Sequence, residues 1–172
     1  MDVVVKMVDG EYLNRGAIRK VVYYINRGAK LLPPNEQIIG SYGIFRGDKP
    51  KDVIKEMLET KRIFDVTDGV QLRHIVISFG TKLNLPRKKI RKLILRTIGQ
   101  WKNRYQMFYG IHHEVNDSGQ PNYHLHLMIN SVDMVTGRKM DLKLKDWIKF
   151  CRQTRRIWQG VVDANYNAQV DG

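Results

Sequence analysis

The spacing of apolar residues along the chain predicts alternating strands and helices. Short β-branched runs and apolar–polar alternation predict strands over residues 2–8, 70–79, 105–114 and 123–132, and a weaker, glycine-interrupted strand over 38–45. Apolar residues at helical spacing predict helices over residues 14–26, 49–64, 83–104 and 142–160. This order predicts an α+β fold, in which helices pack on the faces of a largely antiparallel central β-sheet.

The length and composition favour one domain with its own core, because 172 residues of 42% hydrophobic content show no repeat and no linker-like stretch. We expect this domain to span residues 1–160. Residues 161–172 carry no clear pattern and are expected to form a C-terminal tail. The single cysteine fits a reducing compartment, and no apolar run approaches the ~20 residues of a membrane span. A cytoplasmic protein without a membrane partner is therefore expected.

The formal net charge of +13 indicates a polyanionic partner, either a nucleic acid or an anionic membrane surface. Basic residues concentrate on the polar face of the helix expected over 83–104. Candidates for contact with DNA phosphates are Arg87, Lys88, Arg91 and Lys92 on that helix, and Arg19 and Lys20 on the helix over 14–26. The competing interpretation is that these basic residues form a solvent-exposed helix face that does not contact DNA.

Two histidines lie on one face of the strand expected over 123–132, because His124 and His126 are two residues apart. The strand over 105–114 precedes it after a short loop, so the two should form an antiparallel hairpin. Matching their apolar faces brings His112 to the face of His124 and His126. A register with His112 opposite His124 places Gly110 opposite His126 and leaves room above it, while His113 points to the other side.

Three imidazoles on one face, with a side open to solvent, are typical of a catalytic metal site rather than a structural one. All-imidazole ligation suits Zn, Mn, Fe, Co or Ni better than Mg. The alternative is that these histidines are half-buried packing residues. A metal that faces a basic surface indicates a substrate whose phosphate is cut or transferred.

Several segments resemble the HUH endonucleases and, among them, the conjugative and mobilisation relaxases. "YHLHLMIN" (123–130) is similar to their histidine–hydrophobic–histidine motif with a trailing asparagine, and "GIHHE" (110–114) resembles their H-x-D/E element. "DGVQLRHIVISF" and "INSVDMVTGRKM" resemble two further relaxase segments, and "KVVYYINRGAK" resembles the element that carries a nucleophilic tyrosine. The resemblance spans residues 23–140 and implies an HUH endonuclease fold with a ferredoxin-like or RRM-like palm.

The resemblance implies that His112, His124 and His126 bind a divalent metal ion and that Glu114 orients a metal-binding histidine. Mn²⁺ or Mg²⁺ is the expected ion, with Zn²⁺, Co²⁺ and Ni²⁺ as alternatives. The acid and the following loop depart from the family pattern. The acid is commonly aspartate, whereas Glu114 reaches further, and the loop "NDSGQPN" (116–122) is an insertion relative to many members.

Two adjacent tyrosines stand where the resemblance implies one nucleophile. Tyr24 directly precedes Ile25 and so fits the family pattern better, while Tyr23 competes with it. Both also lie in a helix with an apolar stripe, so packing against the core is the alternative role for either side chain.

Three further polar residues are candidates for positions around the metal site. His74 and Ser78 share a face of the strand over 70–79, which could bring either of them to the scissile phosphate, although a hydrogen-bonded core histidine is the commoner situation. Asn130 lies on the face of His124 and His126, and its alternative role is a hydrogen bond at the end of the sheet.

The activity implied by the resemblance is nicking and rejoining of single-stranded DNA at an origin of transfer, through a 5′-phosphotyrosyl intermediate, which initiates conjugative transfer or mobilisation. The implied partners are an origin hairpin with its nick site, accessory relaxosome proteins and a type IV secretion coupling protein. Family members usually carry further C-terminal regions, so residues 161–172 are expected to lead into such a region.

Two other functions compete with this interpretation. A rolling-circle replication initiator or an HUH transposase shares the same metal and tyrosine chemistry and differs in its DNA substrate. A non-catalytic nucleic-acid-binding α+β domain, in which the histidines only pack, is the alternative from another class.

Overall fold

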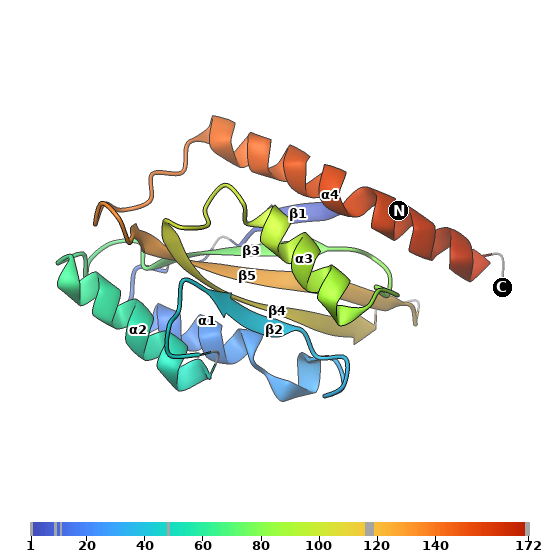
Figure 1. The fold of residues 1–172 in the computed structure, drawn as a ribbon, viewed down its shortest axis with the longest axis horizontal. Helices are drawn as coiled ribbons and strands as arrows, with labels where there is room; N and C mark the ends of the chain where they lie inside the picture. The colour runs from blue at the N-terminus through green and yellow to red at the C-terminus, as the bar shows by residue number, and fades with distance from the viewer. Residues whose placement is uncertain (1, 9, 11, 48, 116–118, 171–172) are drawn as a thin grey trace.

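The computed structural model describes residues 2–8, 10, 12–47, 49–115 and 119–170, and within α4 the side chains of 165, 166 and 168–170 are excepted. Its elements in chain order are β1 (Val4–Met7), α1 (Ala17–Ile25), the 3₁₀ helix η1 (Gly28–Lys30), β2 (Ile39–Tyr42), α2 (Pro50–Ile63), β3 (Leu72–Ser78), α3 (Arg87–Thr97), β4 (Tyr105–Val115), β5 (Pro121–Asp133) and α4 (Leu144–Val170). Figure 1 shows them as a sheet between two helical layers.

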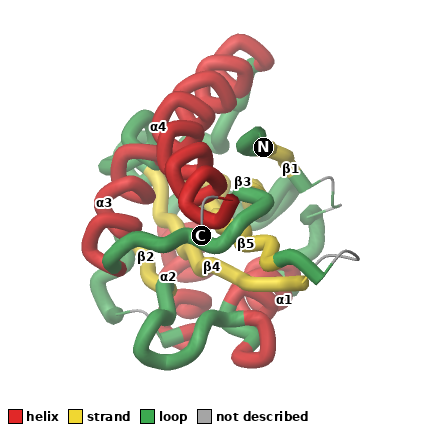
Figure 2. Tube along the Cα trace, turned by 90° about the vertical axis from the view of Figure 1, so that its right-hand side faces the viewer, coloured by secondary structure: helices red, strands yellow, loops and turns green. Residues whose placement is uncertain are grey.

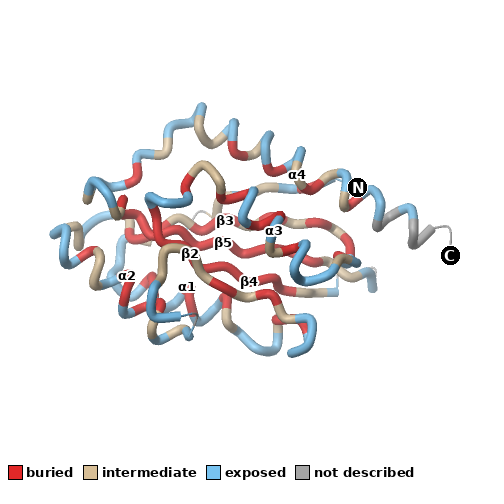
Figure 3. The backbone as a smooth tube through the Cα atoms, in the orientation of Figure 1, coloured by how far each residue is buried: buried red, intermediate tan, exposed pale blue. Residues whose placement is uncertain are grey.

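The sheet has five strands in the order β1-β3-β5-β4-β2, and every neighbouring pair is antiparallel. The long β4–β5 hairpin occupies the centre, and β3 pairs with the other edge of β5. Most residues of these central strands are buried, as Figure 3 shows. The prediction of an α+β fold with a largely antiparallel sheet is confirmed.

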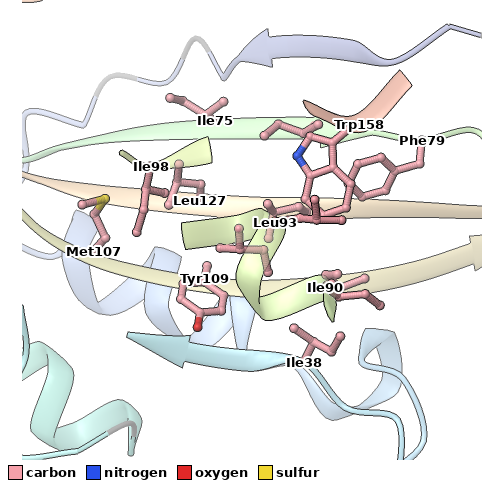
Figure 4. Packing of buried hydrophobic residues seen from close by; sticks show 14 of the residues in the cluster. Ile38, Ile75, Phe79, Ile90, Leu93, Ile98, Met107, Tyr109, Leu127 and Trp158 are labelled. Carbon is pink, nitrogen blue, oxygen red and sulfur yellow. The ribbon is translucent and has the colours of Figure 1, made fainter. Parts of the chain in front are cut away.

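One face of the sheet is covered by α3 and α4, which cross it as seen in Figures 1 and 2. The odd-numbered residues of β5 face this layer: Leu125, Leu127 and Ile129 belong to the same buried cluster as Ile90 and Trp158. Figure 4 shows the packing of this cluster. Burial of these apolar side chains is the main stabilising contribution to the layer.

The opposite face of the sheet is covered by α1 and α2. A second buried cluster joins Ile18 and Val22 of α1 and Met57 of α2 to Phe108 and Met128 of the central hairpin. The even-numbered residues of β5 face this side, so the histidines of that strand lie under the α1–α2 layer rather than under α3 and α4.

The bounds of some helices differ from those predicted. The helix expected over 83–104 is shorter at both ends: it begins after Pro86, which is still extended (φ −56°, ψ 138°), and it ends at Thr97. The last helix continues beyond its expected end at Gly160 to Val170, and Val162 is fully buried in the α3–α4 layer. Of the loop expected over 116–122, residues 116–118 lie outside the described part of the chain.

Candidate functional site

The pairing of β4 with β5 brings three histidines together. His112 lies opposite His124 and Gly110 opposite His126, while His113 pairs with Tyr123 on the other face of the hairpin. The predicted register is therefore confirmed. All three side chains of the cluster are buried, and one ring nitrogen of each lies within 4.8 Å of one on the other two. Donors that converge at this spacing can hold one metal ion.

Two of the three histidines each keep one ring nitrogen that makes no hydrogen bond and so can bind a metal ion. His112 Nε2 donates to the carbonyl oxygen of Ile25 at 2.8 Å, at the end of α1, and His126 Nδ1 lies 3.0 Å from His74 Nε2. The other nitrogens, His112 Nδ1 and His126 Nε2, are buried and have no hydrogen-bond partner among the described residues. Buried ring nitrogens without a partner are rare, and a metal ion would satisfy both lone pairs.

The protonation state of the cluster suits metal binding. Burial is the main cause that lowers the pKa of His112, His124 and His126, and the pKa of His126 falls to about 2. Burial also lowers the pKa of His74 to about 4. The imidazoles are therefore neutral at pH 7, which is the form that binds a metal.

His74 lies beside the metal-binding candidates. Its Nε2 contacts His126, and its Nδ1 lies 3.1 Å from the hydroxyl of Tyr12. The chain Tyr12–His74–His126 fixes the orientation of the His126 ring. Tyr12 was not among the residues that the sequence indicated, because it lies in a turn more than 60 residues away from His74, and no local pattern marks it.

The last turn of α1 places Tyr24 over the histidines. The Tyr24 ring centroid is 5.2 Å from that of His126 and 5.5 Å from that of His112, and the residue is 37% exposed. Tyr23 is 44% exposed, and the described contacts include none between it and a histidine. The structure therefore brings Tyr24 to the cluster, whereas no described ring contact joins Tyr23 to it.

Glu114 lies at the edge of the cluster and forms a salt bridge with Lys30 of η1, with a nitrogen–oxygen distance of 2.5 Å. This hydrogen bond is the main cause that raises the pKa of Lys30 and lowers that of Glu114, so both groups are charged at neutral pH. The Lys30 ammonium also lies 5.7 Å from the Tyr24 ring centroid. Among the described hydrogen bonds, Glu114 makes none to a histidine; the group that orients His112 is the Ile25 carbonyl.

A pocket of about 770 Å³ opens beside Tyr24. It runs along α1 from Tyr24, His74 and His126 past Lys20 to Asn14 at the start of the helix. A ligand in this pocket can therefore reach the candidate nucleophile and the metal-binding face together.

Ser78 and Asn130, the two remaining candidates for positions around the metal, have different surroundings. Ser78 pairs with His124 across β3 and β5 and is partly exposed. Asn130 lies away from the histidines, where its amide nitrogen donates to the Met57 carbonyl and to Gln106. These hydrogen bonds join α2 to the sheet and agree with the alternative role of Asn130 as a hydrogen-bonding residue of the sheet.

The predicted DNA-binding residues lie on opposite sides of the sheet. Arg19 and Lys20 are exposed on α1, and Lys20 lines the pocket beside Tyr24. The four candidates on α3 lie in the layer across the sheet from the histidines, so the structure does not bring them to the site. Two of them hold the backbone before and at the start of β2 instead: Arg87 donates to the Asn35 carbonyl and Arg91 to that of Ile39.

Comparison with known proteins identifies the family. The model of the MobA/VirD2-like relaxase nuclease domain matches residues 26–159. The chain belongs to this family and is the nuclease domain of a DNA relaxase. The match begins after Tyr23 and Tyr24, so it does not bear on the choice between them. Because the matched family consists of nucleases, the alternative of a non-catalytic nucleic-acid-binding domain is excluded.

A solved structure has the same fold. The conjugative relaxase TrwC, in a metal-bound complex with oriT DNA, superposes with a TM-score of 0.51 at 11% sequence identity, over 96% of this chain and 70% of the TrwC chain. The fold is thus that of a relaxase, as the sequence resemblance implied. No curated protein matches the sequence. Among the described residues, no helix is long and apolar enough to cross a membrane.

Proposed function

We propose that this domain nicks and rejoins single-stranded DNA at an origin of transfer, with Tyr24 as the nucleophile and a divalent metal ion held by His112, His124 and His126. The observation that carries the proposal is the position of Tyr24, whose ring lies within 5.5 Å of two of the three histidines. The relaxase fold and the family support the same substrate, since TrwC was solved with oriT DNA and a metal.

The residues of this chain can perform the reaction in one displacement. The Tyr24 hydroxyl oxygen attacks the scissile phosphorus and forms a phosphotyrosyl bond, while the bond from phosphorus to the 3′ oxygen breaks. The phenol loses its proton to solvent, and the departing oxygen takes up a proton to become a 3′-hydroxyl. Since no phosphoester bond is lost, the same 3′-hydroxyl can attack in reverse and reseal the strand.

Lys30 is placed to assist this displacement. Its ammonium lies 5.7 Å from the Tyr24 ring and is held there by Glu114. A cation at this distance stabilises the phenolate character that develops on Tyr24. The bound metal ion would supply Lewis-acid stabilisation of charge on the phosphate oxygens. Mn²⁺ or Mg²⁺ is the ion we propose, as expected from the family.

The test uses labelled single-stranded oligonucleotides that span the candidate transfer origin of the replicon encoding the protein. With Mn²⁺ we expect a covalent protein–DNA adduct that maps by mass spectrometry to Tyr24, and no adduct with EDTA. Tyr24→Phe should abolish the adduct, and the matched variant Tyr23→Phe should retain it. An adduct that persists in Tyr24→Phe and maps to Tyr23 refutes the assignment of the nucleophile.

The substrate separates this proposal from the related enzyme functions. A rolling-circle initiator would form the same adduct with a replication origin, and a transposase would form it with the end of a mobile element. The match to the relaxase family favours the transfer origin.

A further inference from the structure

The pocket beside Tyr24 extends well beyond the nucleophile, and most of its lining has no part in the proposed reaction. Its volume of about 770 Å³ lies in the range of pockets that bind organic ligands. Val76 lines it and stays partly exposed, although it lies on β3, an inner strand of the sheet. Val8, Ala17 and Val21 add further apolar lining. A hollow of this kind suits a flat, largely apolar group rather than a free anion.

Two tyrosine rings line this pocket next to His74. The ring centroid of Tyr12 lies 6.3 Å from that of His74, and the centroid of Tyr24 lies 6.2 Å from it. The backbone carbonyl of Tyr12 accepts from the N–H of Gln71 at 2.6 Å, which fixes the residue against the sheet. A Cβ at Gly10 would lie 2.8 Å from Tyr12 Cζ, so the missing side chain lets the ring lie against the backbone there. Aromatic rings in such a position are the groups on which nucleobases stack.

Two polar groups of the lining can donate hydrogen bonds to a ligand. Asn14 Oδ1 accepts from the backbone N–H of Gly16 at 2.7 Å, so the amide nitrogen of Asn14 is the atom left for a ligand. The Tyr12 oxygen accepts from His74 Nδ1 when His126 keeps its Nε2 for a metal ion, which leaves the Tyr12 hydrogen as a second donor. Burial is the main cause that raises the pKa of Tyr12, so the hydroxyl keeps this hydrogen at neutral pH. Donors favour a base that presents an acceptor over one that presents an amino group.

We propose that one nucleobase of the bound DNA strand enters this pocket, stacks on Tyr12 and accepts a hydrogen bond from Asn14, and that the pocket prefers a base with an exocyclic keto oxygen, thymine or guanine. This inference rests on the proposed function for the identity of the strand. The phosphates of that nucleotide stay outside, where the exposed Lys20 can contact them. Because the pocket adjoins Tyr24, the bound base flanks the scissile phosphate, and the pocket contributes to the choice of the nick site.

The experiment measures equilibrium binding of oligothymidylate and of oligodeoxycytidylate of equal length by fluorescence anisotropy. It uses the Tyr24→Phe protein, which keeps the ring of the nucleophile and cannot form an adduct. Thymine presents a keto oxygen at the position where cytosine presents an amino group. The protein should bind oligothymidylate about fivefold more tightly, the usual effect of one hydrogen bond. Equal affinity for the two oligonucleotides overturns the proposal.

Asn14→Asp replaces the donor by an acceptor, while Oδ1 can still accept from the N–H of Gly16. The added negative charge weakens binding of both oligonucleotides, so the measured quantity is the ratio of the two affinities. This ratio should fall to one or shift in favour of cytosine. The control Asn35→Asp adds the same charge at an exposed residue outside the lining of the pocket and should leave the ratio unchanged. The same ratio in both variants overturns the assignment of Asn14.

Removal of the Tyr12 ring tests the stacking. Tyr12→Ala should weaken binding of both oligonucleotides by about tenfold, the effect of losing one stacked base, and Tyr12→Phe should recover most of this loss because it keeps the ring. The control Leu13→Ala truncates the adjacent exposed side chain, which does not line the pocket, and should bind like the parent protein. Equal affinities in Tyr12→Ala and Leu13→Ala contradict the stacking.

These measurements need neither a metal ion nor cleavage of the strand. Failure of the wild-type protein to nick DNA would therefore refute the proposed function, while the affinities would still decide the base preference. Once a nick site is mapped, variation of each flanking base in the nicking assay locates the bound base. We expect a preference for a keto base at one of the two positions, lost in Asn14→Asp. No preference at either position overturns the placement of the base beside Tyr24.

Discussion

At the scale of single residues, the direction of the hydrogen bonds around His126 decides which of its nitrogens can bind a metal. If Nε2 binds the ion, Nδ1 carries the hydrogen and donates it to His74 Nε2. His74 must then carry its own hydrogen on Nδ1 and donate it to the Tyr12 oxygen, 3.1 Å away. The Tyr12 hydroxyl hydrogen is thereby free to point into the pocket that Tyr12 lines beside Tyr24.

Removal of His74 should therefore weaken metal binding. We expect His74→Leu to reduce the Mn²⁺ affinity measured by calorimetry by roughly 10- to 100-fold, the usual effect of losing a group that orients a metal-binding histidine. Tyr12→Phe should reduce it less, since His74 stays in place. The control Tyr23→Phe should bind the metal normally. Equal affinity in His74→Leu and the wild type would contradict the role of His74.

Lys61 should make stability depend on pH. Burial of its side chain lowers its pKa to about 8 in the folded protein against an ordinary 10.5, so between these values the unfolded chain holds a proton that the folded chain has released. The free energy of unfolding should then rise as the pH increases from 8 to 10.5, by roughly 3 kcal/mol in total. Urea unfolding of the wild type and Lys61→Met at several pH values checks this, because the rise should be absent from the variant.

At the scale of elements, the closeness of α1 to the central hairpin depends on Gly110. A Cβ added at this position would lie 2.9 Å from Ile25 Cγ2 and 3.3 Å from the Ile25 carbonyl oxygen. That carbonyl is the group that accepts the hydrogen bond of His112. A glycine at this point of β4 therefore lets the last turn of α1 reach the metal-binding face.

Gly110→Ala should push α1 away from the hairpin. We expect a loss of stability of about 1–3 kcal/mol, typical of overpacking, together with weaker Mn²⁺ binding because the Ile25 carbonyl no longer orients His112. Gly28→Ala is the matched control, because a Cβ there meets nothing within 4 Å. The expectation fails if both variants have the stability and metal affinity of the wild type.

The hairpin was the element that the sequence predicted best. Alternation of apolar and polar residues fixes which side chains share a face. A shift by one residue would turn the apolar residues of β5 to the face of the histidines, so matching the apolar faces gives the register with His112 opposite His124. The sequence could not place α1 over that face. Its apolar stripe shows that α1 packs on the sheet, but either face would bury it equally well, so the contacts of Ile25 and Lys30 could not be predicted.

At the scale of the whole molecule, the basic residues divide between two sides of the sheet. Net charge is a property of composition, and it predicted a polyanionic partner without saying which surface meets it. For this reason the sequence does not distinguish among the six basic residues predicted to bind DNA, whereas the structure places only Arg19 and Lys20 of these six on the side of the histidines.

Substitution of basic residues should therefore affect nicking differently on the two sides of the sheet. Arg19→Gln combined with Lys20→Gln should lower kcat/KM for a short single-stranded substrate by about tenfold at physiological salt, as expected for two lost phosphate contacts. Lys88→Gln combined with Lys92→Gln removes the same charge from α3 and should change kcat/KM less than twofold. A comparable loss in both double variants would show that the strand also reaches the far side of the sheet.

The distance in sequence between Tyr24 and His126 has a consequence during protein synthesis. A nascent chain that has emerged as far as Gly110 already contains Tyr24 but none of the three histidines that gather beneath it. The last of them arrives with β5, and that strand must also pair with β3 and β4 before the cluster forms. Under the proposed function, a nascent chain that ends before β5 therefore holds the nucleophile without the cluster and cannot cut a DNA strand.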